Sequence, residues 1–511
     1  ISIRLRPQIL VKGIMSTLEN NSRDNRIALY VAVGKILAMV AQFIMPLFLT
    51  RFLSKYDYGI YSQFYLIFGF LLSILGMGVQ SNLYYFYPKT SEHEQNRLVW
   101  GTVILILSIG SIGCGLFLLP SINHFVISNE VLEKYIFIIS SCVFLALPSL
   151  IVDPLSVVRK DRVLAMLYHP LEVVSKIVLV ISFALVFKTL ESIFYGVLIL
   201  QLLIFIFVLI YICRNYPPSH TSISFDSLKQ QLIYSLPFGI AVILNTFSGR
   251  FDKLLSISFL SPEEYATYSI AFFGIPGIMQ IYDSLCQVNV TNMAKLYKEG
   301  NVQGVKNEYK DFVIRTLSFS LPVILIVFVF SPQIIELLFS KTYLDSVPFF
   351  RIYILTFVLA MFGSGTILRA INRTKLSMWA YFCSVLVTLP LSFWLIKEYG
   401  IWGAILSSVI NTVFPKILQI GFEIHVIKSS IKDYFPWKEI LFLTVIALLL
   451  LIPFILLNIL VPLNILAVVI LSVIYISAVY LLYIRHDSFI VDAGTLKAYA
   501  VRVKHKFLKN E

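Results

Sequence analysis

The stretch Tyr234–Ser269, YSLPFGIAVILNTFSGRFDKLLSISFLSPEEYATYS, combines an apolar segment long enough to enter a bilayer with several polar side chains. Asn245, Arg250, Asp252 and Lys253 fall within nine residues. A charge at the centre of a membrane helix costs roughly 2.5–3.5 kcal/mol on insertion scales, so it normally faces protein or a wet cavity. We therefore expect these four residues to face an interior.

The end of this stretch repeats an element near the N-terminus. Residues 260–269 read LSPEEYATYS and residues 53–62 read LSKYDYGIYS, with Leu, Ser, Tyr, Tyr and Ser at a constant offset of 207 residues. An apolar run enters and leaves each copy, which predicts two related halves. In the second copy Ser261, Pro262 and two following glutamates predict the start of a helix, with Ser261 as N-cap.

The composition indicates an all-α polytopic membrane protein. The 511 residues are 58% hydrophobic and 14% charged, and the mean hydropathy is +0.84. Apolar runs of about 20 residues, the length of a transmembrane helix, recur along the chain. We predict about fourteen spans, at 27–50, 59–86, 98–120, 135–156, 163–187, 191–213, 232–258, 266–290, 313–339, 347–371, 376–396, 401–425, 439–460 and 462–484.

The distribution of basic residues predicts the orientation. The formal net charge is +13, which in a soluble protein would suggest nucleic acid binding, but here Lys and Arg lie mostly in loops on one side of the predicted spans. The positive-inside principle places that side, and with an even number of spans both termini, in the cytoplasm. The five cysteines form no CxxC pair, so we expect no disulfide and no metal ligands.

The repeat and the loops together predict two six-helix lobes followed by two further helices. A linker at 214–231, which contains two adjacent prolines, falls where the repeat places the join between the lobes. The predicted segments are a cytoplasmic N-terminal arm at 1–26, an N-lobe at 27–213, the cytoplasmic linker at 214–231, a C-lobe at 232–425, helices 13 and 14 at 426–484 and a basic cytoplasmic tail at 485–511.

Other polar residues inside the spans follow helical spacing. Lys35 and Gln42 share one face of the first span, and Lys35 needs a partner, water or an anionic ligand because no acid lies near it. Glu172 and Lys176 are spaced i, i+4 in the order that favours an intrahelical ion pair. Asp283 lies on the eighth span.

Each of these charges also has a structural explanation. Arg250 and Asp252 can neutralise each other in a contact between lobes. Arg315, Arg369 and Lys416 lie near predicted span ends, close enough to reach the interface by snorkelling.

The charges inside the spans are mainly positive, which suits a phosphate or pyrophosphate group and would repel a simple cation. The sequence carries none of the common hydrolase, P-loop or metalloprotease motifs, so we expect no enzyme.

Several stretches carry a family resemblance. They are FIMPLFLTRFLSKYDYGIYS at 43–62, ALPSLIVDPLSVVRKDR at 146–162, the segment 236–269 quoted above and YGIWGAILSSVIN at 399–411. In these stretches the chain resembles the polysaccharide-transport flippases, the Wzx-type O-antigen and capsule branch of the multidrug/oligosaccharidyl-lipid/polysaccharide exporter superfamily. The resemblance extends over essentially the whole chain.

The resemblance implies two lobes around a central cationic cavity. It also implies transfer of an undecaprenyl-pyrophosphate-linked oligosaccharide to the outer leaflet of a bacterial inner membrane by alternating access. We expect Lys35, Arg250, Lys253 and Lys176 to bind the substrate, and Asp252, Asp283, Glu172, Asn245 and Gln42 to balance charge or couple an ion. No cofactor is expected beyond a coupling proton or sodium ion. A glycan polymerase and chain-length proteins are candidate partners.

Three alternatives stay open at this point. A multidrug cation exporter of the same fold should have an acidic cavity. An integral-membrane glycan polymerase or glycosyltransferase should have a large outer loop with acids or arginines, which this chain lacks. A membrane scaffold without transport activity would not need so many charges inside its spans.

Overall fold

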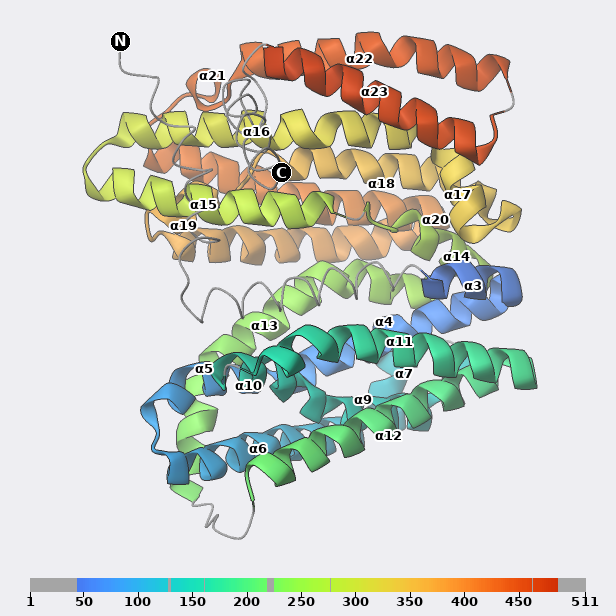
Figure 1. Ribbon diagram of the computed structural model, residues 1–511, viewed down its shortest axis with the longest axis vertical. Helices are drawn as coiled ribbons and strands as arrows, with labels where there is room; N and C mark the ends of the chain where they lie inside the picture. Colours follow the sequence, from blue (N-terminus) through green and yellow to red (C-terminus); the bar gives the residue numbers. More distant parts are fainter. Residues whose placement is uncertain are drawn as a thin grey trace, which may run out of the picture. The chain divides into compact units, whose positions relative to one another are not determined.

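The computed structural model describes residues 44–126, 130–159, 161–217, 225–275, 277–461 and 463–485. Within these ranges the chain forms α-helices and short 3-10 helices, and it contains no strand. The packing divides the chain into two compact units, whose helices are labelled in Figure 1. We call 44–269 with 393–404 the N-terminal unit, and 270–392 with 405–485 the C-terminal unit.

The N-terminal unit is built around a buried apolar cluster to which α6, α10 and α12 contribute, including Val99, Ile106, Leu155 and Val208. Its helices are α3 (Ile44–Phe52), α4 (Lys55–Gly76), α5 (Asn82–Phe86), α6 (Glu92–Phe117), α7 (Pro120–Val126), α8 (Glu130–Glu133), α9 (Ile136–Ala146), α10 (Val152–Val158), α11 (Arg162–Phe187), α12 (Leu190–Asn215), α13 (Phe225–Phe259) and most of α14 (Pro262–Ala271).

The C-terminal unit is organised around α16, which packs against α15, α18, α22 and α23. Its helices are α15 (Ile278–Lys298), α16 (Val302–Val329), α17 (Ser331–Phe339), α18 (Val347–Ala360), α19 (Thr366–Ala370), α20 (Thr374–Val426) without its middle part at 393–404, α21 (Ile431–Tyr434), α22 (Trp437–Leu460) and α23 (Ile465–Arg485). The backbone of α20 is interrupted at Gly400, where φ is 54° and ψ is −128°.

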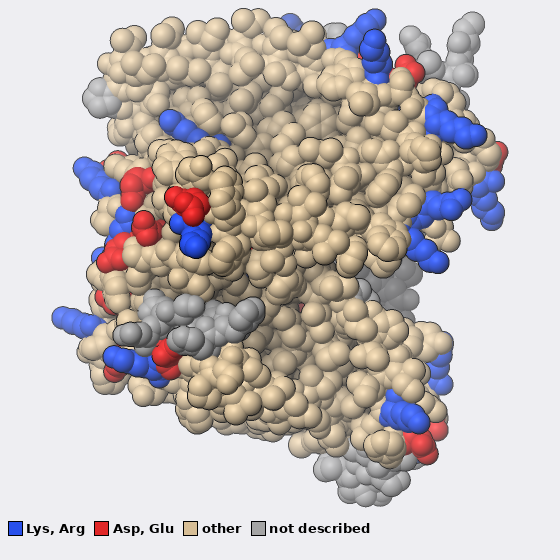
Figure 2. Space-filling view, turned by 180° about the vertical axis from the view of Figure 1, so that it is seen from behind, with Lys and Arg blue, Asp and Glu red and all other residues tan. Residues whose placement is uncertain are grey.

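Ten helices in the described ranges are long and apolar enough to cross a membrane, or eleven if the bent helix α13 is counted. The two parts of α13 meet at 47°, and the bend falls beside Pro237 and Gly239, where a helix is easily bent. In Figure 2 the charged side chains of either unit lie near the ends of its helices, with an uncharged belt between. The chain is therefore a multi-pass helical membrane protein, as predicted.

The predicted count of fourteen spans is not confirmed. The span at 27–50 lies largely outside the described residues, and the spans at 376–396 and 401–425 both fall within α20. The span at 266–290 is broken into α14 and α15.

The helix that contains most of the span predicted at 313–339 begins before the apolar residues of that span. Helix α16 starts at Val302 because the Asn301 side chain accepts a hydrogen bond from the amide of Gly304 at 2.7 Å, which caps a charged first part.

Both copies of the repeated element start a helix with the same cap. Ser54 accepts a hydrogen bond from the amide of Asp57 at 3.0 Å, and Ser261 accepts one from the amide of Glu264 at 3.2 Å. The cap predicted at Ser261 is thus confirmed. Two equivalent residues of the repeat also meet, because the hydroxyls of Ser62 and Ser269 lie 3.3 Å apart.

The close approach of the two elements depends on a glycine. A Cβ atom on Gly59 of α4 would lie 1.8 Å from the carbonyl oxygen of Pro262, so no larger residue fits.

Helix α13, which the sequence places at the start of the C-lobe, packs against α4 and α6 and falls within the N-terminal unit. The lobe boundary at 214–231 and the other segment limits stay predictions.

Candidate functional site

Arg250 rests against α4 at a position without a side chain. A Cβ atom on Gly69 would lie 2.9 Å from Nη1 of Arg250 and 3.9 Å from its Cζ. The guanidinium therefore occupies space that any other residue at position 69 would take. Arg250 is half-buried there, on the part of α13 that follows the bend.

Lys176 reaches the same face of α4 from another helix. Its Nζ atom, carried by α11, lies 3.9 Å from the centre of the Tyr65 ring. Tyr65 and Gly69 are one helical turn apart and so share a face of α4. We call this surface, formed by Tyr65 and Gly69 with Lys176 and Arg250 against them, the cationic face of α4.

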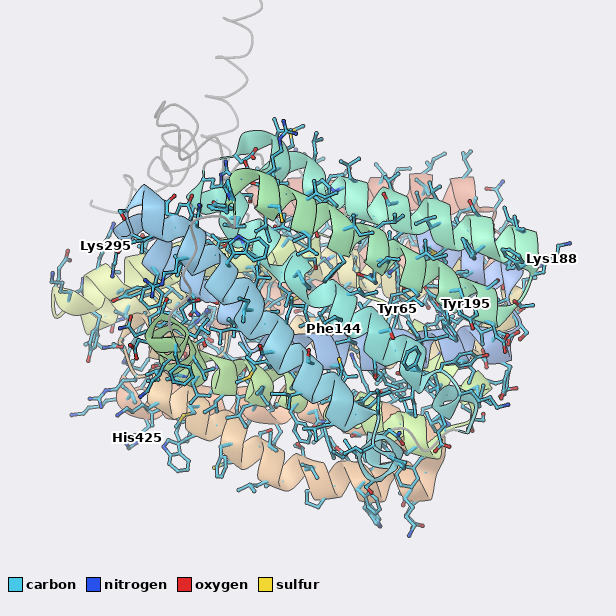
Figure 3. All side chains as sticks on the ribbon, turned by 90° about the horizontal axis from the view of Figure 1, so that it is seen from below. Tyr65, Phe144, Lys188, Tyr195, Lys295 and His425 are labelled. Carbon is cyan, nitrogen blue, oxygen red and sulfur yellow. The ribbon has the colours of Figure 1, made fainter. Side chains whose placement is uncertain are left out.

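The cationic face of α4 lies away from the ends of the helices. In Figure 3 Tyr65 lies between Phe144 and Tyr195, whereas Lys188 lies at the edge of the picture; Tyr65 falls near the middle of α4. Tyr65, Lys176 and Arg250 are all partly buried, so the attraction of a charged ligand to these cations would be screened less than at an exposed site.

Asp252 and Lys253 follow Arg250 on α13. Asp252 is only 3% exposed, and the Tyr268 hydroxyl of α14 donates to its Oδ2 atom at 3.5 Å. Lys253 is partly buried. A buried carboxylate needs hydrogen bonds or opposite charge to stay ionised, and the neighbouring Lys253 provides opposite charge.

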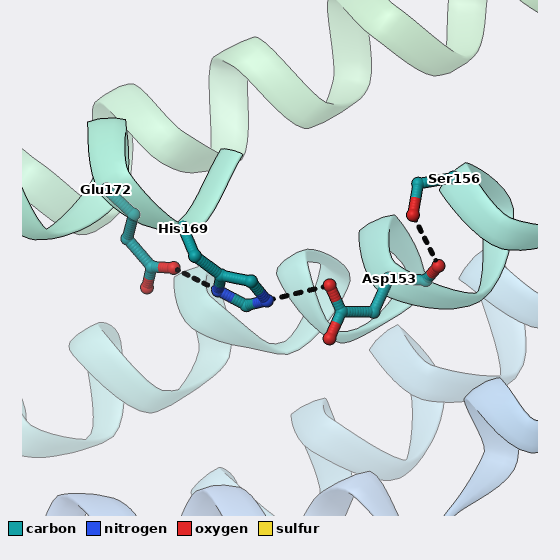
Figure 4. Close-up of polar contacts among 4 residues, drawn as sticks. All are labelled: Asp153, Ser156, His169 and Glu172. Atoms are coloured by element: carbon teal, nitrogen blue, oxygen red, sulfur yellow. Dashed lines mark hydrogen bonds and ion pairs between the residues drawn. The ribbon is translucent and has the colours of Figure 1, made fainter. Parts of the chain in front are cut away.

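Glu172 contacts a histidine that the sequence interpretation left outside the site. The Nδ1 atom of His169 lies 3.6 Å from Glu172 Oε2, and its Nε2 atom lies 2.8 Å from Asp153 Oδ1 (Figure 4). His169, Glu172 and Lys176 are spaced i, i+3 and i+7 on α11, which was a readable signal. Asp153 comes from α10, and no local spacing could have shown that contact.

The remaining predicted residues are not gathered at the cationic face of α4. Asn245 on α13 and Asp283 on α15 are exposed. Lys35 and Gln42 lie outside the described residues, so their roles stay predictions.

In the C-terminal unit the most enclosed charge is Glu423 of α20, which is 0% exposed. Its Oε1 atom accepts from the backbone amides of Ile367 at 2.8 Å and Leu368 at 3.3 Å, and its Oε2 atom accepts from the Tyr434 hydroxyl at 2.7 Å. Burial, with the Glu423 carboxylate as a second cause, raises the pKa of Tyr434 well above its ordinary value, so Tyr434 remains a donor.

Arg369, for which snorkelling to the interface is one explanation, is exposed and donates from Nη2 to the sulfur of Cys286 at 2.7 Å. Both residues belong to the C-terminal unit. A partner on the neighbouring helix α15 thus holds this side chain.

Metal-binding chemistry has no support in the described part of the chain, which holds no cluster of three or more His, Cys, Asp or Glu side chains suited to a metal ion. All five cysteines are free, three of them buried and two exposed.

Comparisons with known proteins identify the relatives of this fold. The sequence model of the family described as "Polysaccharide biosynthesis protein" matches residues 48–348. No curated protein matches the sequence.

Among solved structures, the lipid II flippase MurJ in an inward closed conformation is similar, with a TM-score of 0.68 and 17% identity over 89% of this chain and 98% of that one. An inward-facing multidrug resistance MATE family transporter of the MOP superfamily has a TM-score of 0.63 and 16% identity over 79% of this chain and 97% of that one. A MOP superfamily transporter from Pyrococcus furiosus has a TM-score of 0.53 and 16% identity over 80% and 96% of the two chains. At these identities the likeness shows a shared fold.

Proposed function

We propose that this chain, which belongs to the polysaccharide biosynthesis protein family, is a flippase that moves a lipid-linked oligosaccharide across the membrane. The family and its structural neighbours are transporters and flippases, not enzymes. The observation that carries the proposal is the cationic face of α4, where Lys176 lies over Tyr65 and Arg250 lies against Gly69, one helical turn further along.

The chemistry of the two cations suits a phosphate or pyrophosphate group. Arginine presents a planar fork that can hold two phosphate oxygens at once, and lysine acts as a compact point charge. Lys176 and Arg250 lie against adjacent turns of α4. Together they would replace part of the hydration that a pyrophosphate loses on leaving water. Lys253 and Lys35 would add to this charge. Asp252 would balance it when no substrate is bound.

The bend in α13 would let the site change its access. Arg250 lies after the bend of 47° and Gln231 before it, so a change in the bend would move the guanidinium relative to the start of the helix. Bent helices beside a binding site are common in transporters that work by alternating access.

The proposal also covers the substrate, the membrane, the residues that could couple an ion and the partner proteins. The substrate would be an undecaprenyl-pyrophosphate-linked O-antigen or capsule repeat unit, and the membrane the inner membrane of a bacterium with both chain termini in the cytoplasm. Asp283, Glu172, Asn245 and Gln42 are candidates for charge balance or for coupling to a proton or sodium ion. A glycan polymerase and chain-length proteins would act on the product.

A multidrug exporter is the second candidate, because the fold is shared with a MATE transporter. Two cations on one helix face disfavour it, since they would repel a cationic drug.

The experiment is restoration of surface glycan in a panel of bacterial strains that each lack their own flippase. The wild-type chain should restore glycan in at least one strain, whereas Arg250→Gln and Lys176→Gln should restore little. Loss of one charge-assisted hydrogen bond of ~1.5–3 kcal/mol corresponds to roughly 10- to 150-fold weaker binding.

Two controls keep the test specific. Lys188→Gln removes a lysine at the end of the helix that carries Lys176, and Arg214→Gln removes an exposed arginine at the end of α12. Both should restore glycan as the wild type does. Full restoration by Arg250→Gln and Lys176→Gln, at equal protein levels, would show that the cationic face of α4 does not bind the substrate. Drug resistance without glycan restoration would favour the exporter.

A further inference from the structure

A pocket of about 310 Å³ lies in the N-terminal unit where the start of α6 meets the start of α13. Its volume is at the lower end of the range for small-ligand sites. Gln231, in its wall, precedes Arg250 by 19 residues, which is roughly 28 Å along a helix. The pocket is therefore separate from the cationic face of α4. It is lined mainly by polar side chains, including Thr90, Glu94, Arg97, Asp226 and Gln231.

The pocket presents hydrogen-bond donors, because the side chains of Arg97 and Gln230 line it. Gln231 braces the wall from behind. It is 2% exposed, and its Oε1 atom accepts from the Thr102 hydroxyl at 2.9 Å. Its Nε2 atom is buried against α6, where a Cβ atom on Gly101 would lie 2.7 Å from it. The donors that a ligand would meet are therefore those of Arg97 and Gln230.

The pocket also presents acceptors. Glu94 and Asp226 are exposed carboxylates at the first turns of α6 and α13. The Glu94 carboxylate is held in place, because its Oε2 atom accepts from the Ser91 amide at 3.2 Å and the Ser91 hydroxyl at 3.0 Å. Two carboxylates beside a single guanidinium repel a phosphate group.

This mixture of donors and acceptors matches sugar hydroxyls, each of which can donate one hydrogen bond and accept others. An aromatic wall completes the match. Phe86 lines the pocket, and the ring of Tyr234, 41% exposed, packs edge-on against it with 5.1 Å between centroids. The negative face of an aromatic ring attracts the weakly positive C–H groups on one side of a pyranose.

We propose that this pocket, which we call the α6–α13 pocket, binds sugar residues of the lipid-linked substrate and thereby selects which glycan is transported. The proposal rests on the proposed function. It assigns glycan recognition to the α6–α13 pocket and pyrophosphate binding to the cationic face of α4. Because Asp226 and Gln231 of its wall belong to the predicted cytoplasmic linker at 214–231, the pocket would receive a product of glycosyl transfer on the cytoplasmic side.

The test compares two lipids on protein in nanodiscs. One is undecaprenyl pyrophosphate, which carries no sugar, and the other is the lipid-linked oligosaccharide extracted from a flippase-deficient strain that the wild-type chain restores. The double variant Glu94→Gln/Asp226→Asn replaces both carboxylates by neutral groups of the same shape, and glutamine still supports the helix cap. It should bind the oligosaccharide lipid roughly 30-fold more weakly and undecaprenyl pyrophosphate as the wild type does.

The matched control is Glu264→Gln, since Glu264 makes the same kind of cap with Ser261 on α14 and lies outside the pocket. It should bind both lipids normally. Equal binding of the oligosaccharide lipid by the double variant and the wild type would overturn the sugar-binding role of the α6–α13 pocket. It would leave the proposed flippase function untouched. A wild-type chain that restores no strain and binds neither lipid would instead overturn the proposed function, and this inference with it.

Discussion

Replacing Gly69 by leucine tests the position of Arg250 without touching any charge. The substitution places a side chain where the guanidinium now rests against α4. We expect the variant to lose most of its affinity for undecaprenyl pyrophosphate while remaining folded. The reason is steric, because the cation would be pushed away from the face on which Lys176 also lies.

The structure gives the size of the effect. A Cβ atom at position 69 would lie 2.9 Å from Arg250 Nη1, whereas nonbonded atoms settle at about 3.5–4.0 Å. Alanine therefore displaces the guanidinium by roughly 0.6 Å or more, and leucine by considerably more. A charge-assisted hydrogen bond is formed at about 2.7–2.9 Å and is lost at such displacements. Its loss, ~1.5–3 kcal/mol, predicts roughly 10- to 150-fold weaker binding for Gly69→Leu.

The assay is equilibrium binding of undecaprenyl pyrophosphate to protein in nanodiscs, with a thermal melt of each sample. Stability should not fall for Gly69→Ala, since alanine favours a helix over glycine by about 0.5–1 kcal/mol. Gly115→Leu on α6 is the control, because a Cβ atom there would meet nothing within 4 Å. Wild-type affinity in Gly69→Leu would show that Arg250 does not bind phosphate from this position.

Three further predictions concern the packing of each unit. Tyr434→Phe should lower the stability of the C-terminal unit by about 1–2 kcal/mol in a melt, because buried Glu423 loses a hydrogen bond of 2.7 Å; an unchanged melt would contradict that bond. Gly363→Ala should cost about 2 kcal/mol or more, because φ is +64° and a Cβ atom would lie 2.3 Å from the Phe312 ring; wild-type stability would be inconsistent with this packing. Cysteines at Ser62 and Ser269, whose hydroxyls lie 3.3 Å apart, should crosslink on mild oxidation, as judged by mass spectrometry, and no crosslink is expected if the repeated elements do not meet.

The sequence predicts well those features that depend on neighbouring residues. The membrane class follows from apolar runs, and the cap at Ser261 from a serine, a proline and two acids in order. The repeat likewise predicts that Ser54 and Ser261 open related helices. Each of these features is determined within one turn or one span, so spacing along the chain is sufficient.

The sequence does not predict which helices meet. Arg250 of α13 lies against Gly69 and Lys176 of α11 lies over Tyr65, and these contacts join residues more than a hundred positions apart. Glycine at position 69 has no visible pattern around it, and its role appears only once its neighbour is known.

Two carboxylates also have partners that spacing alone does not show. Asp153 of α10 contacts His169 of α11, which also contacts Glu172 one turn further along its own helix. Glu423 lies near the end of the span predicted at 401–425, yet it is fully buried, and a later tyrosine and two backbone amides bond to its carboxylate.

The most direct measurement is translocation of undecaprenyl-pyrophosphate-linked oligosaccharide in proteoliposomes, read as the fraction of lipid that becomes accessible on the opposite leaflet. The wild-type chain should move the lipid faster than protein-free vesicles do, and the double variant Arg250→Gln/Lys176→Gln should not, although it inserts equally well. Translocation by the double variant at the wild-type rate, or none by the wild type, would contradict the claim that Lys176 and Arg250, at the cationic face of α4, bind the pyrophosphate during transport.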